Sequence, residues 1–134
     1  MAAIPFQFCL NTSTLRGQKL TLVDEVRVAA QAGYDAIEPW VREIDQHVEA
    51  GGSVEELGRQ IRDAGLTVAG GVGFAEWIVD DDQRRARGLE QARREMDRVA
   101  RLGGTFLAAP PVGAADQAGL DLRRAAERYR ALLE

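Results

Sequence analysis

The chain has 134 residues, of which 46% are hydrophobic, 28% charged and 6% aromatic, and its formal net charge at pH 7 is −4. This composition is typical of a single globular domain and excludes collagen-like, coiled-coil and disordered chains. Acidic and basic residues alternate along the chain instead of forming a basic stripe, which argues against a nucleic-acid partner.

Two further observations concern the compartment. No apolar run approaches the roughly 20 residues of a membrane span, so no membrane partner is expected. The chain has one cysteine, Cys9, which cannot form an internal disulfide, and no basic and then apolar leader precedes it. We therefore expect a cytoplasmic location.

The first part of the chain predicts a strand followed by a helix. Residues 6–10, FQFCL, form a short apolar run between Pro5 and a polar cluster, which indicates a buried strand with an inert Cys9 inside it. Thr21 and Asp24 have the spacing of a helix capping box. Apolar residues then follow on one helical face until Gly33 ends the pattern.

The same unit recurs along the rest of the chain. Residues 35–41, 67–74 and 105–109 predict three more strands, and a capping box at residues 53–56 opens a second helix. One or two helical turns are expected around Ile44 and Val48. A long helix ends at residues 103–104, and a last helix covers residues 122–133. Glycines at the helix ends just before strands mark the joints between units.

Short strands alternating with helices imply right-handed crossovers and parallel pairing, as in a doubly wound sheet or a barrel. Residues 11–17, NTSTLRG, lack the G-x-G-x-x-G turn of a dinucleotide fold, which favours the barrel. Such a barrel has eight units in about 250 residues. The prediction is therefore an α/β fold of parallel (β/α) repeats, the N-terminal half of a (β/α)8 TIM barrel, with residues 1–134 as one incomplete domain. An unpaired sheet edge predicts self-association or a complementary half-barrel as partner.

Residues just after the carboxyl ends of strands converge on one face of a barrel. The resulting candidates for substrate binding are Asn11, Glu38, Trp40, Glu76 and Trp77. Glu38 interrupts an apolar run, so it faces a site, a partner or simply solvent. The tryptophans either stack on the apolar face of a sugar or pack in the core, and Asn11 either binds hydroxyl groups or caps a turn. No catalytic residue is assigned.

The sequence offers no metal site. Three consecutive acids, residues 80–82, point in different directions and fit a helix N-terminus better than a cation site. His47 is the single histidine and has no second ligand at metal-binding spacing. Residues 70–73, GGVG, lack the lysine and hydroxyl residue of a phosphate-binding loop and indicate close backbone packing instead.

Several segments together resemble a known family. They are NTSTLRG at 11–17, GYDAIEPW at 33–40, GFAEWIVDD at 73–81, LGG at 102–104 and AAPP at 108–111. In this order they resemble the sugar-phosphate isomerase/epimerase family, one of the xylose-isomerase-like TIM barrels. That superfamily also includes inosose dehydratases, hydroxypyruvate isomerases and DNA-repair enzymes of the endonuclease IV type. The DNA-repair branch is disfavoured because it requires histidines in this half.

The resemblance implies a divalent metal (Mn, Mg, Co or Zn) held by Glu, Asp and His ligands at later strand ends, outside this chain. It implies proton transfer between adjacent carbons of a small sugar or sugar phosphate. Asn11, Glu38, Trp40 and Trp77 match positions on the substrate side of such barrels. The leading hypothesis is an isomerase or epimerase, with a dehydratase-type lyase second, and residues 1–134 alone inactive. The alternative is a non-catalytic half-barrel that serves binding or assembly.

Overall fold

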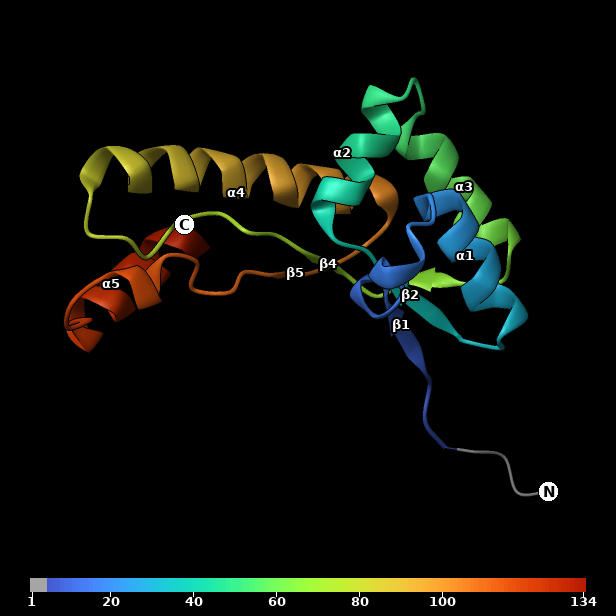
Figure 1. Ribbon diagram of the computed structural model, residues 1–134, viewed down its shortest axis with the longest axis horizontal. Coiled ribbons are helices and arrows are strands. Elements are labelled where there is room, and N and C mark those ends of the chain that lie inside the picture. The colour runs from blue at the N-terminus through green and yellow to red at the C-terminus, as the bar shows by residue number, and fades with distance from the viewer. Residues whose placement is uncertain (1–4) are drawn as a thin grey trace.

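The computed structural model describes residues 5–134 and has an elongated shape with two lobes bridged by one long helix (Figure 1). The helices in chain order are α1 (Leu22–Gln31), α2 (Val41–Glu49), α3 (Val54–Asp63), α4 (Asp82–Leu102) and α5 (Leu122–Leu133), with short 3-10 helices η1 (Thr12–Thr14), η2 (Arg16–Gln18) and η3 (Ala114–Asp116). The strands are β1 (Cys9–Asn11), β2 (Ala36–Glu38), β3 (Thr67–Val68), β4 (Gly71–Val72) and β5 (Leu107–Ala108). No helix in this part of the chain has both the length and the apolar character needed to cross a membrane.

All strand pairs are parallel, as the repeated glycine-to-strand joints predict. β1, β2 and β3 form one sheet in sequential order, and β4 pairs with β5. A parallel bridge between Trp40 and Val72 joins the two sheets. The chain therefore builds consecutive βα units of a parallel barrel and not an open dinucleotide fold.

The single strand expected over residues 67–74 is divided in two. Its first part, β3, pairs with β2, and its second part, β4, pairs with β5. The division falls at Gly70, where an added Cβ would come within 2.5 Å of the Phe106 ring. The strand expected over residues 105–109 is also shorter than predicted. Only Leu107 and Ala108 form it, because only these two residues pair with Gly71 and Val72 of β4.

Helix boundaries follow the predicted capping residues. The Thr21 side chain accepts a hydrogen bond from the Asp24 amide at the start of α1, and Ser53 accepts one from the Glu56 amide at the start of α3. Gly33 and Gly65 follow α1 and α3 with φ of 82°, a backbone conformation that favours glycine. Local sequence thus determines where α1 and α3 begin and end.

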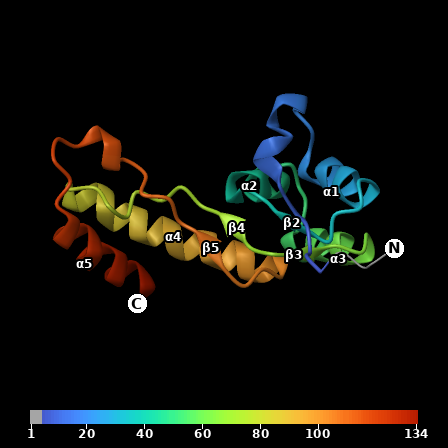
Figure 2. The same ribbon diagram turned by 90° about the horizontal axis from the view of Figure 1, so that it is seen from below.

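Each lobe has its own hydrophobic core. The N-terminal core lies between the sheet and α1–α3, and the C-terminal end of α4 closes it (Figures 1 and 2). It consists of Leu10, Leu22, Val26, Ala29, Ile37, Ile44, Val54, Leu57, Ile61, Leu66 and Leu102. The second core joins α4 to α5, which lie side by side, and consists of Ala75, Trp77, Ile78, Ala92 and Leu132.

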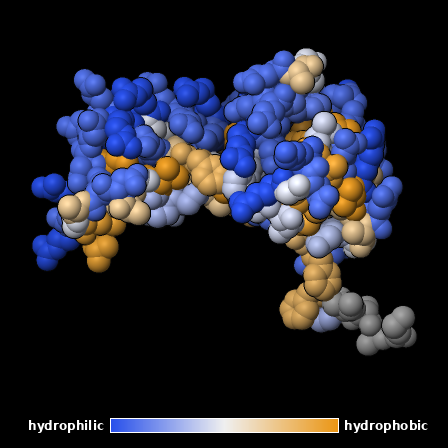
Figure 3. All heavy atoms as spheres, in the orientation of Figure 1, coloured by the Kyte–Doolittle hydropathy of each residue, from blue (hydrophilic) through white to orange (hydrophobic). Residues whose placement is uncertain are grey.

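The prediction that residues 6–10 form a buried strand is wrong for most of that segment. The side chains of Phe6 and Phe8 are 74% and 51% exposed, Cys9 is exposed as well, and only Leu10 is buried. The reason is that β1 pairs with β2 alone, so nothing among residues 5–134 covers its other edge. Apolar atoms accordingly appear on the surface of the segment leading into β1 (Figure 3).

Gly88 lets α4 lie directly against the backbone of the loop before it. An added Cβ would come within 2.6 Å of the Glu76 carbonyl group, a backbone contact that cannot move aside easily. We expect Gly88→Ala to lower the free energy of unfolding by about 2 kcal/mol, although alanine is the better helix former. Urea unfolding measures the loss. Gly17→Ala, where nothing lies within 4 Å of the added Cβ, is the control and should change little.

Candidate functional site

Two predicted site residues are in direct contact at the carboxyl ends of neighbouring strands. Asn11 ends β1 and Glu38 ends β2, and the parallel register pairs their Cα atoms. The Asn11 Nδ2 donates a hydrogen bond of 2.6 Å to Glu38 Oε2. Asn11 Oδ1 also accepts from the Ser13 amide at the start of η1. Asn11 therefore caps the turn, as one of its two predicted roles requires, and its amide nitrogen faces Glu38; its role in binding hydroxyl groups stays a prediction.

Trp40 follows the same strand end, two residues after Glu38. Its backbone amide donates to Thr12 Oγ1 at 3.2 Å and to Glu43 Oε2 at 3.1 Å. Its ring contacts the Phe74 ring, with centroids 4.7 Å apart and planes tilted by 60°, and the guanidinium of Arg42 lies 4.3 Å from its centroid. Trp40 thus adds a half-buried aromatic side chain to the amide and carboxylate of the two strand ends, a combination suited to a hydroxylated ligand.

Two glutamates from the helix layer stand behind these strand ends. Glu43 of α2 accepts a hydrogen bond from the buried Thr12 hydroxyl as well as from Trp40. Glu25 of α1 is 2% exposed, and its Oε2 has no hydrogen-bond partner. Burial, and secondarily the charge of Glu43, raises the pKa of Glu25 to about 7. Glu25 occupies the apolar face of its helix between Leu22 and Val26, a signal that sequence reasoning missed.

A third helix glutamate, Glu95 of α4, supports the end of β4. Its Oε1 accepts from the Phe74 amide at 3.2 Å and from Gln91 Nε2 at 2.8 Å. Its Oε2 lies against Gly73, where an added Cβ would be 2.1 Å away. Because the Phe74 ring contacts Trp40, Glu95 helps to fix the aromatic wall of the site.

Glu76 and Trp77 do not join Asn11, Glu38 and Trp40. Glu76 forms an ion pair with Arg84 at 2.5 Å, and hydrogen bonding to Arg84 lowers the pKa of Glu76. Trp77 is 6% exposed, and its Nε1 donates to the carbonyl groups of Ala109 and Pro110 at 3.1 and 3.2 Å. In this structure both residues have structural partners in the C-terminal lobe.

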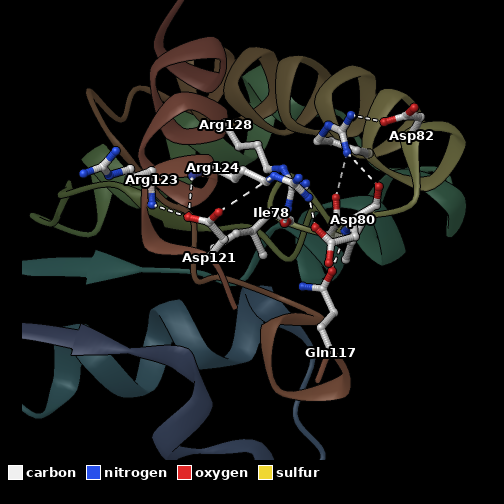
Figure 4. A network of polar contacts seen from close by, with 10 residues as sticks. Ile78, Asp80, Asp82, Gln117, Asp121, Arg123, Arg124 and Arg128 are labelled. Carbon is white, nitrogen blue, oxygen red and sulfur yellow. Dashed lines mark hydrogen bonds and ion pairs between the residues drawn. The ribbon is translucent and has the colours of Figure 1, made fainter. Parts of the chain in front are cut away.

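The consecutive aspartates also stabilise that lobe. Asp81 caps α4 by accepting from the Arg84 amide, as the predicted helix N-terminus requires. Asp80 Oδ1 accepts from Arg128 of α5 at 2.7 Å, and Arg128 also donates to the Ile78 carbonyl at 2.6 Å (Figure 4). The Gln117 side chain accepts from the Asp80 amide. This network attaches α5 to the loop before α4.

The side chains of the described chain do not fit a metal ion. Within residues 5–134, no group of three or more His, Cys, Asp or Glu side chains is placed to hold one. His47 instead lies against Gly52, its buried Nε2 without a hydrogen-bond partner. A metal at the strand ends would therefore need ligands from elsewhere.

A hollow of the described surface has neither Asn11, Glu38 nor Trp40 in its lining. It measures about 650 Å³, lies between α2 and α4, and is lined by Val41, Asp45, Gln91, Arg93, Arg94, Glu95, Asp97, Arg98 and Arg101. Within it, Arg98 pairs with Asp45 at 3.0 Å and Arg101 pairs with Asp97 at 3.5 Å. Because it is a groove between outer helices whose charges largely neutralise one another, we assign the candidate site to Asn11, Glu38 and Trp40.

The buried Glu25 predicts a pH-dependent stability. Its folded-state pKa of about 7 exceeds the ordinary 4.5, so folding favours the protonated form. Its stabilising effect is complete below pH 4.5 and is lost as the pH rises through 7. Relative to Glu25→Gln, the full chain should lose about 2 kcal/mol of unfolding free energy between pH 5 and pH 8. Urea unfolding across this range measures it, and a constant difference would contradict a buried titrating group.

Comparison with known proteins places the chain in a family. The model of the xylose isomerase-like TIM barrel family matches residues 26–134, and the chain belongs to this family. This confirms the resemblance and the barrel fold expected from the sequence. No curated protein sequence matches the chain significantly.

Solved structures share the fold at low sequence identity. A xylose isomerase-like TIM barrel/4-hydroxyphenylpyruvate dioxygenase fusion protein has a TM-score of 0.76 and 20% identity, covering 96% of this chain and 20% of its own. The probable 3-DHS dehydratase AsbF from Bacillus anthracis has a TM-score of 0.76 and 16% identity, and the match covers 95% of this chain and 47% of the AsbF chain. The 3-keto-D-glucoside 4-epimerase YcjR from E. coli has a TM-score of 0.62 and 21% identity, and the match covers 84% of this chain and 44% of the YcjR chain. The chain thus spans less than half of each of these structures.

Proposed function

We propose that this chain supplies part of the substrate-binding face of a sugar-modifying enzyme, an isomerase or epimerase that transfers a proton between adjacent carbons. The observation that carries the proposal is the hydrogen bond of 2.6 Å between Asn11 Nδ2 and Glu38 Oε2 at the paired strand ends, with Trp40 two residues after Glu38. In parallel βα folds, these strand ends are where substrates bind.

The substrate class follows from the chemistry of the three side chains. An amide donor and a carboxylate acceptor side by side match the neighbouring hydroxyl groups of a sugar or sugar phosphate. The indole of Trp40 offers a flat apolar surface for the C–H face of the ring or chain. Asn11 and Glu38 would orient the substrate, and Trp40 would exclude water from one side of it.

The proposed reaction includes a divalent metal, Mn, Mg, Co or Zn, whose ligands come from outside the described residues. When bound, such a metal would polarise a carbonyl or hydroxyl oxygen of the substrate. Since residues 5–134 provide no cluster that fits it, residues 1–134 alone should be inactive. A dehydratase reaction is the second possibility, because one structural neighbour is a probable 3-DHS dehydratase.

A non-catalytic binding or assembly module is the competing function. It is favoured by the open sheet edges and by apolar side chains beside them, since Phe8 and Phe106 are 51% and 52% exposed. Such edges promote self-association or pairing with a complementary half-barrel. Sedimentation of residues 1–134 with and without the remaining barrel units distinguishes a monomer from these assemblies.

Solvent deuterium incorporation tests the catalytic proposal. The full protein with Mn²⁺ is incubated in D₂O with a panel of ketoses, aldoses and their phosphates. Mass spectrometry then measures the molecular masses of the recovered sugars. Isomerase or epimerase chemistry exchanges a carbon-bound hydrogen, so one substrate should gain one deuterium. Loss of water from a substrate would identify the dehydratase reaction instead. If no sugar gains deuterium and none loses water, the result favours the non-catalytic module.

A further inference from the structure

A second cavity borders the candidate site. It measures about 240 Å³ and is lined by Arg16, Lys19, Leu20, Glu25, Arg42, Glu43 and Gln46. Its walls come from η2 and the residues after it, from α1 and from the first turns of α2. Since η2 follows β1 and α2 follows β2, the cavity opens at the same end of the sheet as Asn11 and Glu38.

The cavity gathers three basic side chains that have no ion-pair partner. Arg16, Lys19 and Arg42 form no salt bridge within residues 5–134, and the Arg42 guanidinium lies over the Trp40 ring. Elsewhere in this part of the chain, eight arginines pair with carboxylates and six others form no salt bridge. What distinguishes Arg16, Lys19 and Arg42 is that all three line one hollow at the strand-end side of the sheet.

The two carboxyl groups of the cavity do not neutralise these cations fully. Glu43 Oε2 is already occupied by the Thr12 hydroxyl and the Trp40 amide. Glu25 is 2% exposed, its Oε2 lacks a partner, and its raised pKa leaves it largely protonated below pH 7. A protonated carboxyl group donates a hydrogen bond instead of repelling an anion. The cavity thus has a surplus of donors and positive charge.

We propose that Arg16, Lys19 and Arg42 form an oxyanion subsite that binds the phosphate or carboxylate group of the substrate, next to the sugar-binding residues. Guanidinium groups bind tetrahedral and planar oxyanions through paired N–H donors, and the lysine adds a point charge. A water molecule occupies about 30 Å³ of liquid, so the cavity has room for an oxyanion together with several waters. Only the assignment of the anion to a sugar rests on the proposed function.

Contacts through Trp40 would couple this subsite to the candidate site. The Arg42 guanidinium lies over the Trp40 ring at 4.3 Å, and Glu43 holds the Trp40 amide. An anion that draws Arg42 into the cavity would therefore alter the surroundings of the indole. Trp40 emission and its indole N–H signal report on anion binding without any turnover.

Sulfate is the probe, because it does not titrate near neutral pH. The full chain is titrated with sulfate at constant ionic strength, and ¹H–¹⁵N spectra follow residues 16–20, 40 and 42. We expect saturable shifts at these residues and at least tenfold weaker binding in the Arg16→Gln/Lys19→Gln and Arg42→Gln variants. Arg130→Gln, an exposed position on α5, is the control and should bind as the parent does. Shifts that do not saturate, or equal affinity in all variants, would overturn the subsite.

A pH series tests the contribution of Glu25. The charged groups that line the cavity with it are Glu43 and Arg42 from α2 and Arg16 and Lys19 from the η2 segment, and of these Glu43 acts on the pKa of Glu25. Sulfate should bind several-fold more tightly at pH 6 than at pH 8, and Glu25→Gln should remove most of this dependence. The same dependence in Glu25→Gln would contradict a role for this carboxyl group in the subsite.

Two small ligands distinguish the possible sources of the anion. Glycerol phosphate and glycerate carry the same short hydroxylated chain, with a phosphate or a carboxylate group. The tighter ligand identifies the substrate class, and failure of both to compete with sulfate overturns the assignment to a substrate group. If sulfate binds and no sugar gains deuterium, the subsite stands and the proposed reaction fails, so the two outcomes are distinguishable.

Discussion

Replacing Glu38 with glutamine should lower kcat/KM for the sugar identified by deuterium incorporation by about 100-fold, because misplacing a bound substrate slightly has an effect of this size. The Glu38 carboxylate accepts from Asn11 at 2.6 Å and has capacity left for a substrate hydroxyl group. Glutamine preserves the shape and the Asn11 contact but removes the charge. Steady-state kinetics of the full protein measure the loss.

The stability of the Glu38→Gln variant separates a site role from a structural one. Glu38 is half-buried at a strand end, so its unfolding free energy should change by less than about 1 kcal/mol. Glu90→Gln, at an exposed position of α4, should change neither activity nor stability. A Glu38 variant that unfolds easily while its folded fraction keeps full activity would show that Glu38 is structural.

Trp77→Ala should lower the free energy of unfolding by about 3–5 kcal/mol, the usual cost of emptying a large aromatic site in a core. The indole is 6% exposed, donates to two carbonyl groups and lies against the Tyr129 ring, with centroids 5.6 Å apart. Its removal would leave a cavity between α4 and α5. Urea unfolding, together with the loss of helical circular dichroism, measures the effect.

Trp40→Ala is the matched control for Trp77. Its ring is half-buried, so the same substitution should cost about 1–2 kcal/mol and should affect ligand binding more than stability. If Trp40 and Trp77 contributed equally to stability, and neither variant lost ligand binding, the distinction between a site tryptophan and a core tryptophan would be wrong.

Local signals in the sequence are sufficient to predict most of the framework. Thr21 and Ser53 mark helix starts by side-chain capping, and Gly33 and Gly65 mark helix ends by their positive φ. Alternation of strands and helices then requires parallel pairing. The approach of Asn11 to Glu38 follows from the same logic, because neighbouring parallel strands end at one edge.

Other features depend on contacts between distant segments and cannot be found in this way. Phe8 resembles a buried strand residue, but its exposure is set by the unpaired edge of β1. Trp77 follows a strand like Trp40 does, yet α5 covers it. The buried Glu25 and Glu95 interrupt apolar helix faces, which signals an unusual position, but only the fold shows what each side chain approaches.

The central claim is that a sugar contacts the ends of β1 and β2, and ¹H–¹⁵N spectra of the full chain titrated with the substrate sugar test it most directly. We predict saturable shifts of the Asn11 side-chain amide and the Trp40 indole, both reduced in Glu38→Gln. Shifts confined to the groove between α2 and α4, at residues such as Asp45 and Arg94, with Asn11 and Trp40 unchanged, would contradict it.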